Sequence, residues 1–410
     1  MHGRGGQINT LTISLINNIT GLLAAKSWPS DNFWIHWVFY TLVILIAVLS
    51  IVMGFIYMER RLIARMQSRL GPNRTGPWGL LQPVADAVKV LLKEDIIPDK
   101  ADKLIYWLAP IVAFFPVLLI FAVVPFANNA LLTDLNIGVL YVLAVSSLTA
   151  VGVFMAGWSS NNKYSLLGAM RNIAALVSYE LPLMLSTIGI VIITGSLSLN
   201  QIVVSQNIPF ILLQPLGFLL FFIGGCAEIN RSPFDLLEAD SELVAGHHTE
   251  YSGMKFAMFY LVEYAEALAL SALIATFFLS GWKGPLLPPL IWLLVKVFAV
   301  FAIMIWTRAT FPRMRIDQLM GLAWKGLLPI GLINLVITGI EVVVFPNWYA
   351  SWLMVLVNWV VAIVLITLWA KIFKIGWLKI EIFNQGNRTD GRVSVDPEKS
   401  VPTSRDNSIS

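Results

Sequence analysis

The segment CAEINRSPFDLLEADSELVAGHHTEYSGMKFAMFYLVEYAE occupies residues Cys226–Glu266. It completes one apolar stretch, crosses an acidic connection and enters a second apolar stretch. Its charged residues recur at intervals of three and four, the spacing of one helix face. They are Glu228, Arg231, Asp235, Glu238 and Glu242. With Asp240 included, five carboxylates against one arginine give this connection a formal charge of −4, in a chain whose net charge is +4.

Two interpretations of this acidity are open. Charge runs are commonly solvated helix faces, which requires no function. Pro233 argues against a plain solvated helix, because proline interrupts a helix interior. Glu263 lies inside the following apolar stretch without a charge-balancing neighbour in the sequence. An ionised carboxylate at mid-bilayer costs about 2.5–3.5 kcal/mol. We therefore expect Glu263 to face protein or water and to have a function.

The composition is that of an all-α, polytopic membrane protein. The chain has 410 residues, of which 57% are hydrophobic and 13% charged, and its mean hydropathy is +0.76. Its one cysteine excludes an internal disulfide, a self-contained iron–sulfur cluster and a cysteine-ligated zinc site. The adjacent His247 and His248 lack an evident third ligand, so we predict no metal. We attribute the pI of about 9.1 to basic residues beside the membrane rather than to nucleic-acid binding.

The apolar segments predict about nine membrane-spanning helices, each near the roughly 20 residues needed to cross a bilayer. They lie near residues 33–57, 104–126, 137–157, 173–195, 209–227, 254–279, 286–306, 326–345 and 348–373. The predicted organisation is an interfacial segment at 1–32, a core of eight helices at 33–345, a ninth helix within 346–382 and a disordered polar tail at 383–410. With the N-terminus outside and the C-terminus inside, 24 of the 28 Lys and Arg residues lie on the inner side, as the positive-inside rule requires.

Polar residues outside the acidic connection are further candidates. The segment LLQPVADAVKVLLKED, residues 80–95, predicts an amphipathic helix, which either lies on the bilayer surface or contributes to a site. Glu180 precedes Pro182, which frees a backbone carbonyl, and its alternative role is a structural ion pair. Lys296 is the one base within the later apolar stretches, and Glu263 is a possible partner for it.

Four blocks of the sequence together resemble the H-type membrane subunits of proton-pumping NADH:quinone oxidoreductase, respiratory complex I. The blocks are ERRLIARMQSRLGPNRTGPWGLLQPVADAVKVLLKE, YSLLGAMRNIAALVSYELPL, AEINRSPFDLLEADSELVAGHHTEYSGMKFAMFYLVEYAE and RATFPRMRIDQLMGLAWKGLLP. The resemblance implies a subunit that forms the membrane mouth of a quinone tunnel and an acidic path for protons. It implies quinone as the substrate, with neither nicotinamide nor an electron-carrying cofactor bound by this chain.

The resemblance also implies residue roles. The quinone-tunnel residues would be Glu59, Arg60, Arg69 and Asp86. The proton conduit would consist of Glu180, Glu228, Glu238, Asp240, Glu242, Glu250 and Glu263. Several acids in a low-dielectric region would have coupled titrations, which suits proton transfer.

The implied partners are the peripheral-arm quinone-site and iron–sulfur subunits, the small and antiporter-like membrane subunits, quinone and lipid. The expected location is an energy-transducing membrane, taken to be a bacterial inner membrane. One alternative is the equivalent subunit of a ferredoxin–plastoquinone oxidoreductase or a membrane hydrogenase, since other chains set the electron donor. A stand-alone cation/proton transporter is a third hypothesis, but the inverted repeats typical of many such transporters are not evident in the sequence.

Overall fold

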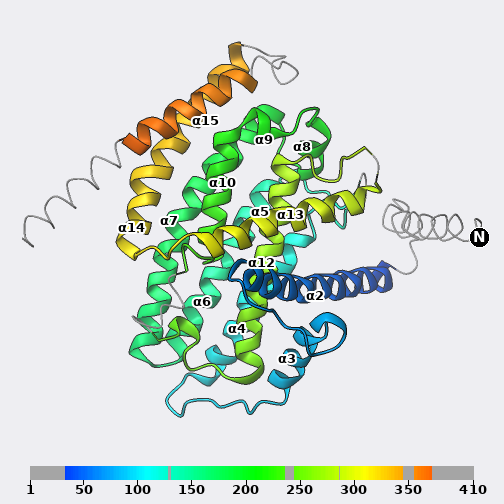
Figure 1. The fold of residues 1–410 in the computed structure, drawn as a ribbon, viewed down its shortest axis with the longest axis vertical. Helices are drawn as coiled ribbons and strands as arrows, with labels where there is room; N and C mark the ends of the chain where they lie inside the picture. The colour runs from blue at the N-terminus through cyan, green and yellow to red at the C-terminus, as the bar shows by residue number, and fades with distance from the viewer. Residues whose placement is uncertain (1–32, 128–130, 236–243, 286, 345–354, 372–410) are drawn as a thin grey trace, which may run out of the picture. The chain divides into compact units, whose positions relative to one another are not determined.

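The computed structural model describes residues 33–127, 131–235, 244–285, 287–344 and 355–371. The described residues form helices and connections and contain no β-strand, which confirms the predicted all-α class (Figure 1). The chain divides into two compact units, Met1–Trp359 and Val360–Ser410. The predicted segments 1–32 and 383–410 lie outside the described residues.

Seven helical segments of the described residues are long and apolar enough to cross a membrane. They comprise α2 (Phe33–Met66), α4 (Lys103–Phe121), α5 with α6 (Gly138–Ser146 and Leu148–Ser159), α7 (Lys163–Thr194), α12 (Gly253–Phe278), α13 (Pro289–Thr310), and α14, η3 and α15 in succession (Ile316–Gly321, Leu322–Leu327 and Leu328–Val344). Two shorter apolar helices are α10 (Pro215–Glu228) and Val355–Lys371. Seven of the nine predicted spans therefore have a helix of sufficient length, and the two shorter helices lie at the other two positions, near 209–227 and 348–373. The N-out orientation stays a prediction.

The remaining described elements are short. They are η1 (Pro77–Gly79), α3 (Gln82–Leu91), α8 (Leu199–Ser205), α9 (Phe210–Leu213) and η2 (Gly246–His248). The helix α3 falls within the predicted amphipathic segment and begins with a proline in its first turn, as expected. Val84, Val88 and Leu91 on α3 are exposed, so its apolar face is left for lipid or another chain.

Several helix boundaries differ from the predicted ones for local reasons. Helix α2 continues to Met66 rather than ending near residue 57, because neither glycine nor proline occurs between residue 57 and Gly71. Helix α7 begins at Lys163 rather than near 173, because the Asn162 side chain caps it by accepting a hydrogen bond from the Tyr164 N–H at 2.9 Å. It ends at Thr194 and is followed by Gly195, whose φ of 65° is the left-handed conformation common after a helix C-terminus.

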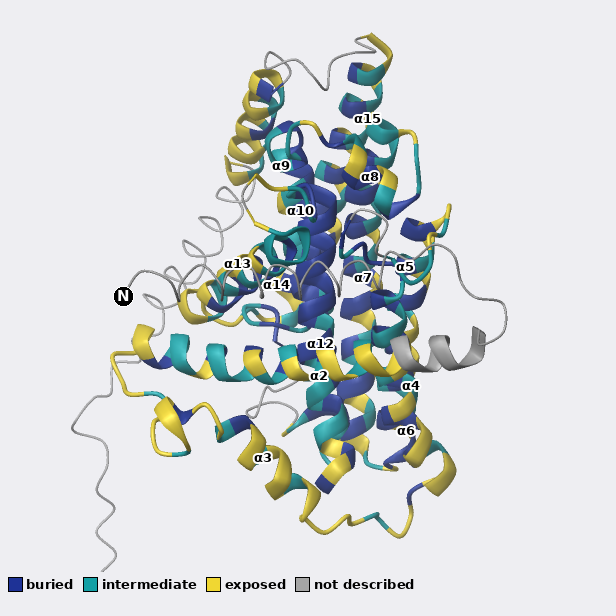
Figure 2. Ribbon diagram, turned by 90° about the vertical axis from the view of Figure 1, so that its right-hand side faces the viewer, coloured by how far each residue is buried: buried dark blue, intermediate teal, exposed yellow. Residues whose placement is uncertain are grey.

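Helix α12 is the central element. In its most apolar stretch 83% of the residues are buried, compared with 17% for α2, and Figure 2 colours much of α12 as buried. It packs against α4, α13 and α2, and α2 runs across it in both views (Figures 1 and 2). A helix that is apolar on all sides and enclosed by others is a core helix. Any charged residue on α12 is therefore held among other helices.

Small residues allow the helices beside α12 to pack closely. A Cβ added at Gly152 on α6 would lie 2.6 Å from the backbone nitrogen of Ala113 on α4. A Cβ added at Gly157 would lie 2.3 Å from the Ala169 Cβ on α7. Close approach of this kind is typical of membrane helices, which associate through van der Waals packing. The α4–α6–α7 layer thus has little freedom to shift.

The C-terminal end of α12 is held by polar groups that bind backbone carbonyls. The Gln206 side-chain amide donates to the carbonyls of Thr276 and Phe277, both at 2.9 Å. The Lys296 ammonium donates to the carbonyls of Gly281 and Lys283, at 2.8 and 2.7 Å. Cations are favourable at helix C-termini, where carbonyls lack helical partners. The suggested pairing of Lys296 with Glu263 is therefore wrong, because the ammonium binds carbonyls beyond the C-terminal end of α12, far along the helix from Glu263.

Candidate functional site: a charge centre beside a polar cavity

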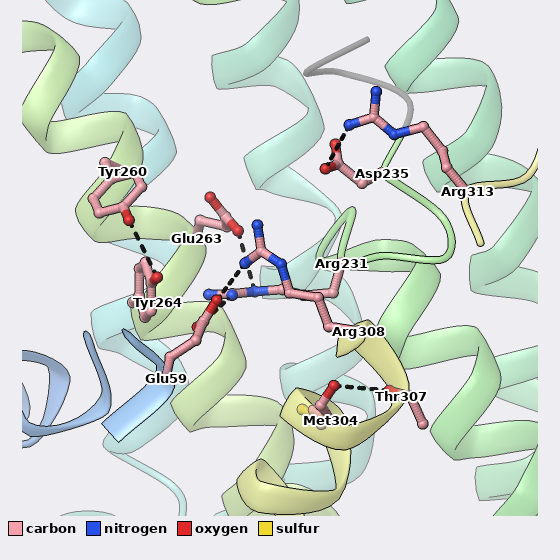
Figure 3. A network of polar contacts seen from close by, with 10 residues as sticks. All are labelled: Glu59, Arg231, Asp235, Tyr260, Glu263, Tyr264, Met304, Thr307, Arg308 and Arg313. Atoms are coloured by element: carbon pink, nitrogen blue, oxygen red, sulfur yellow. Dashed lines mark hydrogen bonds and ion pairs between the residues drawn. The ribbon is translucent and has the colours of Figure 1, made fainter. Parts of the chain in front are cut away.

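Two carboxylates and two guanidinium groups meet where α2, α12, α13 and the connection after α10 converge. The Arg231 side chain binds Glu59 at 2.6 Å and Glu263 at 3.1 Å, while Arg308 binds the other oxygen of Glu59 (Figure 3). We call these four residues the charge centre. Their formal charges cancel, so the buried Glu59 and the partly exposed Glu263 both have the counter-charges that a low-dielectric region requires.

Arg231 is the residue that joins the charge centre. It is only 4% exposed, and its guanidinium lies 4.3 Å from the centre of the Tyr264 ring, a cation–π contact. Burial by itself would lower the pKa of Arg231, but the carboxylates of Glu263 and Glu59 outweigh that effect, and the pKa is raised above its ordinary value. Arg231 is therefore a permanent positive charge.

The extension of α2 beyond the predicted membrane span places two neighbouring residues in different settings. Glu59 points into the charge centre, whereas Arg60 is half-exposed and forms an ion pair with Asp86 on α3. The Gln82 amide also donates to Asp86, at 3.1 Å. Successive residues on a helix face different directions, so one turn of α2 serves both a buried and an exposed cluster.

A polar cavity of about 80 Å³ lies beside the charge centre, large enough for several water molecules. Its polar lining includes Asn172 from α7, Glu228 from α10, and Glu263 and Glu266 from α12. No lysine or arginine is among the described residues that line it. Asn172 is 2% exposed, and neither its amide nitrogen nor its amide oxygen has a hydrogen-bond partner in the described part of the chain. Water in the cavity would satisfy these atoms.

His247 and His248 close the cavity on the side of η2. Burial lowers the pKa of His247 well below its ordinary value, and His248 beside it lowers it further. Burial also lowers the pKa of His248, to about 4, against a smaller opposing effect of Asp235. Both imidazoles are therefore neutral near pH 7. Within the described ranges, no group of three or more His, Cys, Asp or Glu side chains could hold a metal ion.

The connection that carries the histidines is held against α4 and α7. Ser165 on α7 donates to the His247 carbonyl at 2.9 Å. The rings of Tyr106 and Tyr251 stack with centroids 4.0 Å apart, and Lys255 pairs with Asp95 at 2.9 Å. These contacts connect the start of α12 to α4 and to the segment before it, so the cavity wall is fixed from several directions.

The structure brings together only some of the residues named from the sequence. Glu59, Glu228 and Glu263 lie in the charge centre or its cavity, and Glu180 on α7 interacts electrostatically with Glu228. Glu180 has no ion pair with any residue that the structure describes, so the alternative of a structural bridge lacks a partner there.

The other named residues lie elsewhere. Glu250 accepts a hydrogen bond from the Asn162 amide at 2.6 Å, away from the cavity lining. Arg69 is exposed, and its guanidinium donates to Gln67 at 2.8 Å. The predicted conduit residues Glu238, Asp240 and Glu242 lie outside the described residues.

Four residues of this region were not assigned a role from the sequence: Asn172, Arg231, Glu266 and Arg308. A lone base in an acidic run, as Arg231 is, could have identified one of them. Glu266 was visible as a second acid within the span. Asn172 and Arg308 carry no comparable local signal, because their role depends on side chains from other helices.

Comparison with known proteins gives a consistent assignment. The sequence model of the family described as NADH dehydrogenase matches residues 39–339. The H-type subunit of NADH-quinone oxidoreductase from Dehalococcoides mccartyi is 58% identical over 352 residues, covering 86% of this chain and 99% of that protein. The corresponding H-type protein of Bacillus cytotoxicus is 49% identical over 327 residues, covering 78% and 97%. The chain therefore belongs to the NADH dehydrogenase family, as an H-type membrane subunit of NADH-quinone oxidoreductase, complex I.

Proposed function

We propose that this chain forms the membrane mouth of the quinone tunnel and an acidic conduit that couples quinone reduction to proton pumping. Quinone is the substrate, and the chain itself binds no nicotinamide and carries no electrons. In this scheme Glu59, Arg60, Arg69 and Asp86 serve the mouth. The conduit acids are Glu180, Glu228, Glu238, Asp240, Glu242, Glu250 and Glu263.

One observation carries this proposal: Arg231 binds one residue from each of the two sets. Its partners are Glu59, assigned to the mouth, and Glu263, assigned to the conduit. Charges about 4 Å apart interact by about 4 kcal/mol at an effective dielectric constant of 20. A change of charge at the mouth therefore alters the electrostatic energy of Glu263 through one shared guanidinium.

The polar cavity supplies the second half of the scheme. Glu263 belongs both to the charge centre and to the cavity lining, where Glu228 also lies. When the ion pair between Arg231 and Glu263 weakens, proton uptake by the Glu263 carboxyl becomes more favourable. Water in the cavity can then carry the proton to Glu228. The neutral His247 and His248 offer ring nitrogens on the lining of the same cavity.

The proposed setting is a bacterial inner membrane. The partners would be the peripheral-arm quinone-site and iron–sulfur subunits, and the neighbouring small and antiporter-like membrane subunits. Other chains determine the electron donor, so purification of the intact complex and identification of its peripheral subunits would establish it.

The conduit is tested by Glu228→Gln and Glu263→Gln in the assembled complex. Each substitution keeps the shape of the side chain and removes the titratable group. We expect the rate of quinone reduction and the proton pumping coupled to it to fall by about tenfold or more, as for the loss of a proton-transfer group. The measurements are NADH oxidation with a short-chain quinone and acidification of sealed vesicles.

Glu341→Gln is the matched control, because Glu341 is a buried carboxyl on α15 that lines neither the polar cavity nor the charge centre. If both Glu228→Gln and Glu263→Gln reduced quinone and pumped protons at wild-type rates, the proposed conduit would be refuted. The mouth is tested separately, since Arg69→Ala should raise the apparent KM for quinone with little change in kcat.

A further inference from the structure

A second, smaller cavity lies next to the polar cavity. Its volume is about 40 Å³, enough for one or a few water molecules. Apart from Ser146, Thr149, Glu228 and Glu266, its lining is apolar. Its lining includes residues of α12 from Glu266 to Phe277.

The two cavities share a wall that contains two carboxyl groups. Glu228, Glu266 and Thr149 line both of them. Glu266 interacts electrostatically with Glu228 across this wall and with Glu263 on the side of the charge centre. None of the ion pairs among the described residues includes Glu228 or Glu266, in contrast to Glu263.

Each of the two carboxyl groups has a hydroxyl beside it. Ser146 lies next to Glu228, and Thr149 lies next to Glu266. The hydroxyls are also within hydrogen-bond reach of helix carbonyls, Ser146 to Leu143 at 3.1 Å and Thr149 to Ser146 at 2.8 Å. A hydroxyl can rotate to donate to an ionised carboxylate or accept from a protonated carboxyl. The surroundings of both acids therefore suit both protonation states.

An independent feature indicates that the larger cavity holds a polar occupant. Asn172 is buried and lines this cavity, and its amide nitrogen and oxygen both lack hydrogen-bond partners among the described residues. The His247 Nδ1 atom, on the same lining, also lacks one. Leaving such buried groups unpaired is unfavourable. Water would satisfy them and supply the hydrogen-bonded path between the carboxyl groups.

We propose that Glu228 and Glu266 share one proton across the common wall, so that Glu266 passes protons from the larger cavity into the smaller one. The O–H bond on Glu228 breaks, and an O–H bond forms on Glu266, directly or through a water molecule. The negative charge moves from Glu266 to Glu228, and no electron is transferred. This inference rests on the proposed conduit and adds a proton-carrying residue to it.

The test uses the assembled complex in sealed vesicles, with Glu266→Gln, Glu266→Asp and the control Glu341→Gln. We expect Glu266→Gln to lower proton pumping by about tenfold or more, Glu266→Asp to retain most of it, and Glu341→Gln to match the wild type. The content of this chain in the purified complex verifies that each variant assembles. Pumping by Glu266→Gln within a factor of two of the control would overturn the inference.

Infrared difference spectroscopy provides a readout that a merely structural role would not change. Quinone reduction should alter a carboxylic-acid band that Glu266→Gln removes and Glu341→Gln retains. A band that persists unchanged in Glu266→Gln would also overturn the inference. If Glu228→Gln and Glu263→Gln impair coupling while Glu266→Gln does not, only the role of Glu266 fails. If none of the three impairs coupling, the conduit itself fails.

Discussion

The charge centre and the shared wall between the cavities hold the same kind of residue under opposite electrostatic conditions. In the charge centre, Glu59 and Glu263 face two guanidinium groups, and their charges are compensated. At the shared wall, Glu228 and Glu266 face hydroxyls and each other. Burial disfavours an ionised carboxylate in both regions, but only the first supplies fixed counter-charges.

This difference separates two roles for membrane-embedded acids. A compensated carboxylate has its charge offset by fixed partners and helps to position them, at the cost of taking both charges out of water. An uncompensated pair can hold a single proton and exchange it. Glu263 belongs to the first region through its ion pair with Arg231, and it also lines the larger cavity, which Glu228 and Glu266 of the shared wall line too. It therefore connects the two regions.

The largest expected effect comes from Arg231→Met, which removes the shared counter-charge. Glu59 would keep Arg308, whereas Glu263 would lose its ion pair with Arg231. Removing one partner of a buried ion pair costs about 3–5 kcal/mol. We expect a lower denaturation temperature of the purified complex and less of this chain in the membrane. Partial recovery in the double variant Arg231→Met with Glu263→Gln would show that the loss comes from an uncompensated charge.

If Arg231→Met leaves the denaturation temperature unchanged, the charge centre is not compensated by Arg231 and the contrast between the two regions disappears. Arg231→Lys sharpens the test. Lysine keeps the charge but lacks the planar group that reaches two carboxylates at once, so an intermediate loss is expected.

A smaller effect is expected from pH, acting on the neutral wall of the cavity. The pKa of His248 is lowered from its ordinary 6.5 to about 4. Between about pH 4 and pH 6.5, His248 therefore binds a proton in the unfolded chain but not in the folded chain. The resulting stability is complete above pH 6.5 and is lost as the pH falls toward 4, by up to about 3 kcal/mol.

His248→Phe should reduce this pH dependence, since phenylalanine keeps an aromatic ring beside Phe256 and cannot titrate. The measurement is the denaturation temperature of the complex between pH 7 and pH 4, compared with the wild type. Because His247 remains, and burial lowers its pKa as well, some pH dependence persists. Identical pH profiles for variant and wild type would contradict a neutral, buried His248.

The smallest effect on stability is expected from Arg60→Ala, the exposed counterpart of the Arg231 substitution. The Arg60–Asp86 pair has side chains 40% and 33% exposed, so solvent screens it. Such pairs contribute about 0–1 kcal/mol. We expect little change in denaturation temperature but a higher apparent KM for quinone, measured by steady-state kinetics. A stability loss as large as that of Arg231→Met would refute the distinction between buried and exposed ion pairs.

The amino-acid sequence was enough to establish that the chain is a bundle of membrane helices. Runs of apolar residues and the proline in the first turn of α3 are local signals, and the corresponding helices form near the predicted positions. Glu263 could be recognised as a candidate for the same reason, because an acid within an apolar stretch is unfavourable wherever that stretch crosses a bilayer. The family resemblance supplied the roles of Glu59 and Glu228, which local patterns alone do not give.

Which charges meet was settled by the packing of the helices. Glu59 and Arg231 are 172 positions apart, and Arg308 is 249 positions from Glu59. The same packing directs Lys296 to backbone carbonyls instead of Glu263, and sets Glu266 in a wall between two cavities. Hydrophobicity acts residue by residue and can be read along a chain, whereas charge compensation depends on distances of a few ångströms between helices, which exist only after they have packed.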